Sequence, residues 1–356
     1  MKPTPEKNAM RILLRQRGFS LVEIMVALTL SLILLAGVLA VMYSSKVTYM
    51  ENERVGRLQE NGRAALEFIL RDLRGSGFPG CAQPIEGLFD MNNTLTTPTS
   101  VAWNLAQPVY GFEATSGTAW TPTRDALIPA TATGGNDIIV VRTIPVGAPS
   151  MRVSAIVNPT ADIAVTKGAS EILTVGTPAI ISDCANASIF VVSTFTAAAD
   201  GESATIQRAT GGGPPANSTT DLGAVFSPGA RVTPINSIAY YVAPDAAGTG
   251  GPSLWRRVSL SAPQELIPGV ERLQIRYGVS TGTGTVVTQY VDANAVTDWT
   301  RVISVTLAVL VRSAEQNSQI VDSRAYQLLT TTFTAPSDRF QRALFTTTVT
   351  LRNRTT

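Results

Sequence analysis

The strongest feature of the hydropathy pattern is an apolar run near the start of the chain. No charged residue occurs between positions 24 and 42. In a helix rising about 1.5 Å per residue, this run reaches about 28 Å, close to the hydrocarbon thickness of a bilayer. The pattern predicts a membrane-spanning helix, because a soluble core helix is rarely this long and this apolar.

The helical pattern continues beyond the apolar run. Residues 46–74 contain no proline, and apolar side chains recur every three or four positions. Gly75, Gly77 and Pro79 then predict the end of the helix. We therefore expect one helix from about Phe19 to Arg74, about 80 Å long. Its first half is apolar all round and its second half is amphipathic, and no proline demands a kink.

After the helix the pattern becomes that of β-structure. Residues 82–135 hold five prolines among many Thr, Asn and Ser, which predicts irregular loops and short strands. From there to the end, apolar and β-branched runs alternate with turn residues. The predicted strands are residues 137–143, 151–157, 179–182, 188–195, 204–209, 238–242, 254–259, 273–279, 286–291, 302–312 and 344–351. Residues 302–311 are the most apolar and predict a central strand. The fold class expected is α+β.

Composition excludes several classes of function. The 356 residues carry a net charge of +2, which favours neither nucleic-acid binding nor an acidic-substrate site. The chain has no histidine, so His-based triads and most zinc sites are excluded. The glycine-rich stretches 211–215 and 248–252 lack the Lys-Ser/Thr of a phosphate loop. We predict no catalytic residue, metal, cofactor or small-molecule substrate, and we expect most of the four tryptophans to pack in the core.

Charges before the apolar run predict its orientation. Five basic residues precede it against the single acid Glu6: Lys2, Lys7, Arg11, Arg15 and Arg17. By the positive-inside rule this end lies in the cytoplasm, and everything after Tyr43 lies outside the inner membrane.

Glu23 is the anomaly of the apolar helix. A carboxylate there costs a few kcal/mol unless it finds a positive partner. If the chain were cut after Gly18, Phe19 would gain an α-amino group one helical turn from Glu23, in the same chain or in a neighbour. Two simpler interpretations stay open: an ordinary anchor with a chance glutamate, and a secretory signal cut after the run, although no small-x-small site follows it.

Residues 18–23, Gly-Phe-Ser-Leu-Val-Glu behind a basic leader, resemble the class III signal of type IV prepilins and type II secretion pseudopilins. The resemblance implies that a prepilin peptidase cuts between Gly18 and Phe19, with Arg15 and Arg17 in the leader. It also implies N-methylation of Phe19 and a role for Glu23 in filament assembly.

Two further segments resemble the minor pilin family PilW. The first is the helix end, with LQENGR at 58–63, ALEF at 65–68, RDLR at 71–74, GF at 77–78 and GC at 80–81. The second is the ending FTTTVTLRNR at 345–354. The resemblance implies a type IV pilin-like fold, in which the long helix packs on a large β-rich head. It also implies a minor pilin that primes pilus assembly at or near the filament tip and supports twitching motility or adhesion.

The expected organisation has four segments. These are a cleaved leader (1–18), a transmembrane and assembly helix (19–43), its amphipathic continuation (44–75) and a periplasmic head (76–356). The implied partners are other minor pilins, the major pilin, prepilin peptidase, the inner-membrane assembly platform and a tip adhesin. In an exported head, Cys81 and Cys184 are expected to form one disulfide, worth about 4–5 kcal/mol by loop entropy. Two separate buried thiols are the alternative.

Two other functional classes remain open at this point. A large minor pseudopilin of a type II secretion system would share the signal, the helix and the β-rich head. A membrane-anchored periplasmic binding protein that never assembles would show no cleavage at Gly18 and would tolerate changes at Glu23.

Overall fold

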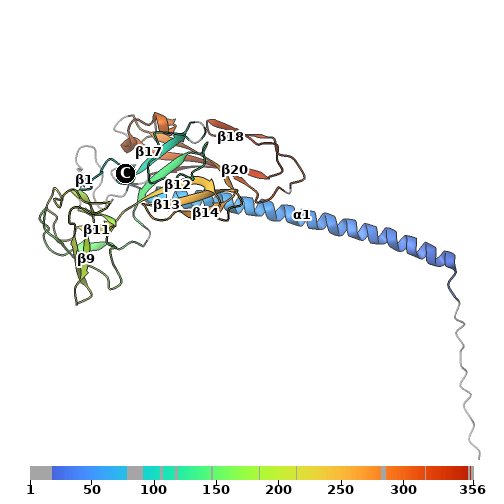
Figure 1. The fold of residues 1–356 in the computed structure, drawn as a ribbon, viewed down its shortest axis with the longest axis horizontal. Coiled ribbons are helices and arrows are strands. Elements are labelled where there is room, and N and C mark those ends of the chain that lie inside the picture. Colours follow the sequence, from blue (N-terminus) through green and yellow to red (C-terminus); the bar gives the residue numbers. More distant parts are fainter. Residues whose placement is uncertain are drawn as a thin grey trace, which may run out of the picture. The chain divides into compact units, whose positions relative to one another are not determined.

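The computed structural model describes residues 18–77, 91–104, 107–115, 117, 119–145, 147–183, 185–213, 215–281, 286–316, 318–351 and 353. The chain forms two compact units, one ending at Arg54 and the other beginning at Val55. Both units share one helix, α1 (Leu21–Gly75), which confirms the single long helix expected from the sequence (Figure 1).

The two halves of α1 differ in burial as the pattern predicts. Every residue from Gly18 to Lys46 is exposed. In the second unit the helix buries one stripe, which comprises Leu58, Gly62, Ala65, Leu66, Ile69, Leu70, Asp72 and Leu73. The helix ends at Gly75, where the Ser76 hydroxyl donates to the Leu73 carbonyl over 2.7 Å and Gly77 takes a left-handed φ of 68°.

Two sheets of the head form the layer on which the buried stripe of α1 packs. The six-stranded sheet has the order β14 (Gln264–Pro268), β13 (Pro252–Val258), β12 (Asn236–Pro244), β4 (Ile138–Thr143), β2 (Val109–Ala114) and β3 (Trp120–Thr121). The four-stranded sheet has the order β16 (Gln289–Val291), β15 (Val270–Val279), β17 (Val302–Arg312) and β20 (Arg342–Thr350). Short 3₁₀ helices η1 (Ala293–Ala295) and η2 (Trp299–Arg301) join β16 to β17.

An eight-stranded sheet forms a third layer. Its order is β1 (Met91–Asn93), β8 (Ala187–Val191), β7 (Pro178–Ser182), β11 (Arg231–Pro234), β5 (Met151–Val153), β6 (Ile163–Thr166), β10 (Ser203–Gln207) and β9 (Thr194–Ala197). All of its strands except β1 are inserted between β4 and β12, which pair directly in the six-stranded sheet. Only Val192 and Ser193 separate β8 from β9, near opposite ends of this order, so the sheet must curl around its own core. The hairpin β18 (Ala325–Leu328) and β19 (Thr331–Thr334) is separate.

Three main hydrophobic clusters hold these layers together. The first joins α1 to one face of the six- and four-stranded sheets, through residues such as Leu66, Tyr240 and Leu307. The second joins the opposite face of the six-stranded sheet to the eight-stranded sheet, and the third lies inside the eight-stranded sheet. Strands β7 and β8 are buried on both faces, which explains their apolar character.

Most predicted strands are present, and residues 302–311 lie in β17, between β15 and β20, as expected of a central strand. The prediction of one strand over residues 188–195 is wrong, because the segment forms two strands, β8 and β9, with a break between them. Strand β8 pairs with β7, whereas β9 pairs with β10. Strands β1, β2 and β3 lie in residues 82–135, where the pattern predicts short strands without giving their bounds, and the strands that it missed are β6, β11, β14, β18 and β19. Trp103, Trp120 and Trp299 are buried, as predicted for most of the tryptophans.

Polar contacts fix α1 on the sheets. The Tyr240 hydroxyl donates to the Asp72 carboxylate over 2.6 Å and lies 3.2 Å from the Phe68 carbonyl. Asp72 and Tyr240 are both buried. About three turns earlier in the helix, the Asn61 amide donates to the Pro268 carbonyl over 3.1 Å. A carboxylate removed from water needs a partner, so the bond to Asp72 sets where the helix lies along the sheet.

Replacing Tyr240 with phenylalanine is expected to destabilise the head by about 2 kcal/mol, because Asp72 loses its shortest hydrogen bond while remaining buried. Tyr241→Phe is the matched control, since the Tyr241 hydroxyl is also buried but has no hydrogen-bond partner among the residues that the structure describes. Thermal unfolding of the detergent-solubilised chain, followed by circular dichroism, checks this. Equal melting temperatures for the two variants would contradict the assignment.

Candidate functional site

The predicted site residues that the structure describes lie just before α1 and in its first turn. The first helical hydrogen bond runs from the Ile24 amide to the Ser20 carbonyl, so the helix begins at Leu21, two residues later than predicted. Terminal residues lack intrahelical partners and helix ends fray, which accounts for this difference. Gly18 and Phe19 precede the helix and are exposed, Phe19 by 78%.

Glu23 lies in the first turn of α1 and is exposed. It makes no hydrogen bond or ion pair with any residue in the described part of the chain. A carboxylate at a helix N-terminus gains about 0.3–1 kcal/mol from the helix dipole. The cost of a carboxylate reaches about 2.5–3.5 kcal/mol at the centre of a bilayer helix, and Glu23 lies at the edge of the apolar run. Helix stabilisation therefore offsets only part of the cost that Glu23 incurs if this turn enters the hydrocarbon.

The apolar half of α1 is uncovered in the single chain. Large side chains from Leu21 to Tyr43 are exposed, and α1 is the one helix in the described chain long and apolar enough to cross a membrane. Apolar surface of this extent requires lipid or other protein around it. A carboxylate without a partner on such a surface requires a cation from another molecule, or from the residues before Gly18 if they stay attached.

A second polar site, which the sequence pattern did not reveal, joins the six- and four-stranded sheets. The Asp137 carboxylate accepts from the Ala114 amide over 3.0 Å and from the Ile275 amide over 2.8 Å. Beside it, Glu113 accepts from the Ala293 amide over 3.3 Å. The residues come from elements far apart in the chain, so no spacing could have identified them.

Burial raises the pKa values of two acids at this junction. Burial and the neighbouring charge of Asp292 raise the pKa of Glu113 to about 7. Burial and the charge of Glu113 raise the pKa of Asp137 well above its ordinary value, although both of its oxygens accept backbone hydrogen bonds. The two acids therefore hold their protons to higher pH in the folded head than in the unfolded chain.

This arrangement predicts a pH-dependent stability. A raised carboxyl pKa gives stability that is complete below the ordinary value of 4.5 and is lost as the pH rises through about 7. Since Glu113 is only half-buried, its contribution to the free energy of unfolding is about 1–2 kcal/mol after solvent screening.

Glu113→Gln keeps an oxygen for the Ala293 amide and should raise the melting temperature at pH 8 but not at pH 4. Glu202→Gln, an exposed control, should change neither. A Glu113→Gln variant no more stable than wild type at pH 8 would refute the prediction.

Another charged cluster in the described part of the head is centred on Arg342. Arg342 is buried and forms paired contacts with Glu271 and Asp338, the closest being 2.6 and 2.7 Å. Asp322 lies 3.3 Å from the same guanidinium. Within the described ranges, no group of three or more His, Cys, Asp or Glu could hold a metal ion.

Four of the predicted site residues lie outside the described residues. These are Arg15, Arg17, Cys81 and Cys184. The role of the leader charges and the disulfide therefore remain predictions.

Comparisons with known proteins bear on both ends of the chain. The family model of the type IV pilus-assembly protein W matches residues 239–353, and the prokaryotic N-terminal methylation motif matches residues 13–39. The first match contains all but the last residue of the C-terminal segment that resembles PilW, and the second contains Gly18, Phe19 and Glu23. Among curated proteins nothing matches.

Among solved structures, the chain is similar to a type IV-like pilin from Thermus thermophilus, with 18% identity and a TM-score of 0.20. That similarity covers 34% of this chain and 68% of the other. The two family matches confirm the resemblance to PilW, and with the exposed apolar helix they support a membrane-anchored, structural role in type IV pilus assembly. Residues 151–234, which form seven strands of the eight-stranded sheet, lie outside both matched regions.

Proposed function

We propose that this chain is a minor pilin that primes assembly of a type IV pilus. In this proposal prepilin peptidase removes residues 1–18, and the new amine of Phe19 is methylated. Residues 19–43 anchor the subunit in the inner membrane and later pack in the filament. The head, residues 76–356, lies in the periplasm and is closed by a Cys81–Cys184 disulfide.

The observation that carries the proposal is the exposed carboxylate of Glu23 on the uncovered apolar half of α1. Before assembly the subunit lies in the membrane, where lipid surrounds the apolar side chains. In the filament, the helices of neighbouring subunits surround them. A neighbour's terminal amine satisfies Glu23 in the second environment, which gives assembly a driving force that lipid does not supply.

The size of the head favours a place at or near the tip. The head of a subunit repeated along a thin filament must pack against the heads of many identical copies. The seven strands inserted between β4 and β12 make this head larger. At a tip the head need not be tiled, and it can contact other minor pilins, the major pilin and a tip adhesin. The assembly platform of the inner membrane is the remaining partner, and twitching motility or adhesion is the cellular process served.

The test is the N-terminal mass of the protein extracted from membranes. A mature chain that begins with methylated Phe19 is expected, with Gly18→Leu as the variant that keeps its leader. An intact leader in the wild-type protein would refute the pilin proposal and favour an ordinary membrane anchor. Recovery of the mature chain with secretion-system components, and not with sheared pili, would favour the pseudopilin alternative.

A further inference from the structure

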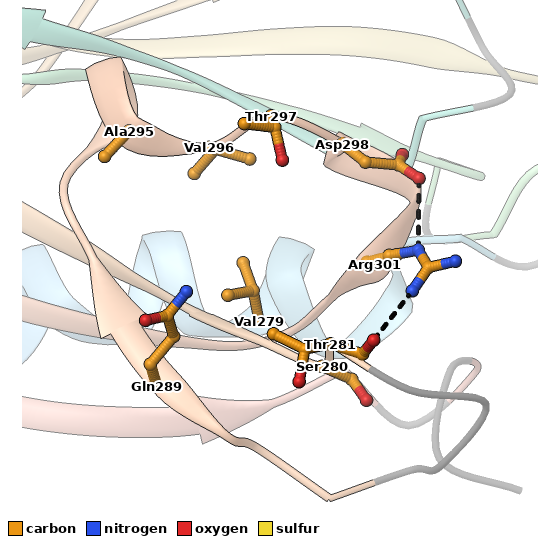
Figure 2. Close-up of a pocket in the computed structure, with 9 residues that line it drawn as sticks. All are labelled: Val279, Ser280, Thr281, Gln289, Ala295, Val296, Thr297, Asp298 and Arg301. Atoms are coloured by element: carbon orange, nitrogen blue, oxygen red, sulfur yellow. Dashed lines mark hydrogen bonds and ion pairs between the residues drawn. The ribbon is translucent and has the colours of Figure 1, made fainter.

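A cavity in the head lies between the segment that joins β16 to β17, residues 292–301, and the hairpin of β15 and β16 (Figure 2). Its volume is about 260 Å³. The segment contains the helix turns η1 and η2 and passes over the cavity as an arch. The lining residues are Val279, Ser280, Thr281, Gln289, Ala295, Val296, Thr297, Asp298 and Arg301.

Both ends of the arch are fixed by contacts with the sheets. At the η1 end, the Ala293 amide donates to Glu113, and Asp292 pairs with Arg276 over 3.0 Å. At the η2 end, the buried Trp299 ring contacts Tyr110 and Tyr277, with ring centroids 4.7 and 4.8 Å away. The η2 end is anchored by the buried Trp299 and Tyr277, and the η1 end by the hydrogen bond and ion pair of partly exposed side chains. Because both ends are held by contacts within the chain, the cavity exists without a ligand, and binding would not have to order the arch.

The cavity has apolar side chains on both sides and polar groups beside them. Val279 points into it from β15, and Ala295 and Val296 line the arch above (Figure 2). The remaining uncharged side chains bear hydroxyl or amide groups; Ser280 is buried, and the exposed ones, which form the rim, are Thr281, Thr297 and Gln289. Hydroxyl and amide groups both donate and accept hydrogen bonds, so this rim suits a ligand with several groups of the same double character.

The charges at the rim balance one another. Arg301 lies 3.4 Å from the Asp298 carboxylate and donates to the Thr281 carbonyl over 3.2 Å, which closes one end of the cavity (Figure 2). Burial acts to raise the pKa of Asp298, but hydrogen bonds from Thr300 and the pair with Arg301 outweigh it and hold that pKa below its ordinary value. Asp298 therefore stays ionised opposite a cation, and the rim favours a neutral ligand over a charged one.

Size and polarity together select the ligand class. Pockets for drug-sized molecules span about 300–1,000 Å³, so this cavity fits one smaller unit. An apolar side chain of a peptide ligand would favour a pocket with an apolar, desolvated lining, whereas the rim of this cavity is polar. We propose that the cavity binds a single neutral sugar residue, such as one hexose or N-acetylhexosamine unit of a surface glycan. This inference does not depend on the proposed role in pilus assembly.

The test is ligand-detected saturation-transfer NMR on the detergent-solubilised full chain, with glucose, galactose and N-acetylglucosamine as probes. We expect millimolar binding that Ala295→Trp weakens at least about tenfold by filling the cavity. Gln289→Leu removes one amide and should weaken binding about three- to tenfold. The matched control is Thr160→Trp, which fills a different surface hollow, lined by Asp162 and Arg208, and should leave binding unchanged.

Three results would overturn the proposal. They are no binding of any neutral sugar at millimolar concentration, equal binding by Ala295→Trp and wild type, and preferential binding of charged sugars or of apolar peptides. Melting temperatures of the variants, measured in parallel, separate a lost site from a lost fold. If Ala295→Trp unfolds, the test rests on Gln289→Leu, which changes the side-chain volume little, and equal sugar binding by Gln289→Leu and wild type would then overturn the proposal.

Discussion

Alanine at position 23 is expected to leave processing of the leader intact and to reduce incorporation of the subunit into sheared filaments by up to about 100-fold. Glu23 is exposed and has no partner among the described residues. An unpaired carboxylate costs up to about 2.5–3.5 kcal/mol in an apolar helix, the largest cost being at the bilayer centre, and a cation in the filament relieves this cost; each 1.4 kcal/mol is about a factor of ten. Without the carboxylate, lipid and filament become similar environments for the helix.

The measurement is the amount of subunit in sheared filaments relative to membranes, together with the N-terminal mass of each variant. Thr29→Ala is the control, because the Thr29 hydroxyl donates to the Val26 carbonyl of its own helix over 2.9 Å. Glu23→Gln should reduce incorporation into filaments as much as Glu23→Ala does if the negative charge is required. Normal incorporation of Glu23→Ala would show that the glutamate is incidental, as an ordinary anchor requires.

Leucine at position 62 is expected to destabilise the head by about 3 kcal/mol and to lower its melting temperature by roughly 6–12 °C. Gly62 faces the Phe345 ring of β20, and a Cβ at position 62 would overlap atoms of that ring. Either the ring leaves the core that it packs against or the helix lifts from the sheet. The loss exceeds the gain of at most about 1 kcal/mol from removing a helical glycine.

Gly56→Leu is the matched control on the same helix, because nothing lies within 4 Å of a Cβ built there. It should be neutral or slightly stabilising by helix propensity. The double variant Gly62→Leu with Phe345→Ala tests the mechanism, since a smaller side chain on β20 should recover part of the lost stability. A Gly62→Leu variant as stable as Gly56→Leu would contradict the close packing of helix and strand.

The parts of the fold that follow from local pattern were predictable. The helix α1 follows from a long apolar run and a 3.6-residue period, and β17 follows from a nearly unbroken apolar stretch. The missed strands are mostly short, such as β11 (Arg231–Pro234) and β14 (Gln264–Pro268), which also contain proline and charged residues. Such segments become strands because a neighbouring strand pairs with them, which propensity does not encode.

The same distinction between local pattern and contacts across the fold applies to the candidate sites. Glu23 was identifiable because its cost depends only on the apolar residues around it in the sequence. The acids Glu113, Asp137 and Asp292 were not, because three separate segments bring them together and each resembles an ordinary surface acid in the sequence. The cavity beneath the arch was equally hidden, since its lining residues show no motif.

The sequence by itself determined the long helix, the change in its character near residue 46 and the α+β class, because these depend on periodicity and composition over short distances. Only the tertiary structure decided that most of an eight-stranded sheet is inserted between β4 and β12. It also decided that the Phe345 ring packs against Gly62 and that the Tyr240 hydroxyl donates a hydrogen bond to Asp72. The last two features depend on contacts between residues far apart in the chain, whose energies come from packing and desolvation at surfaces that exist only after the sheets have formed.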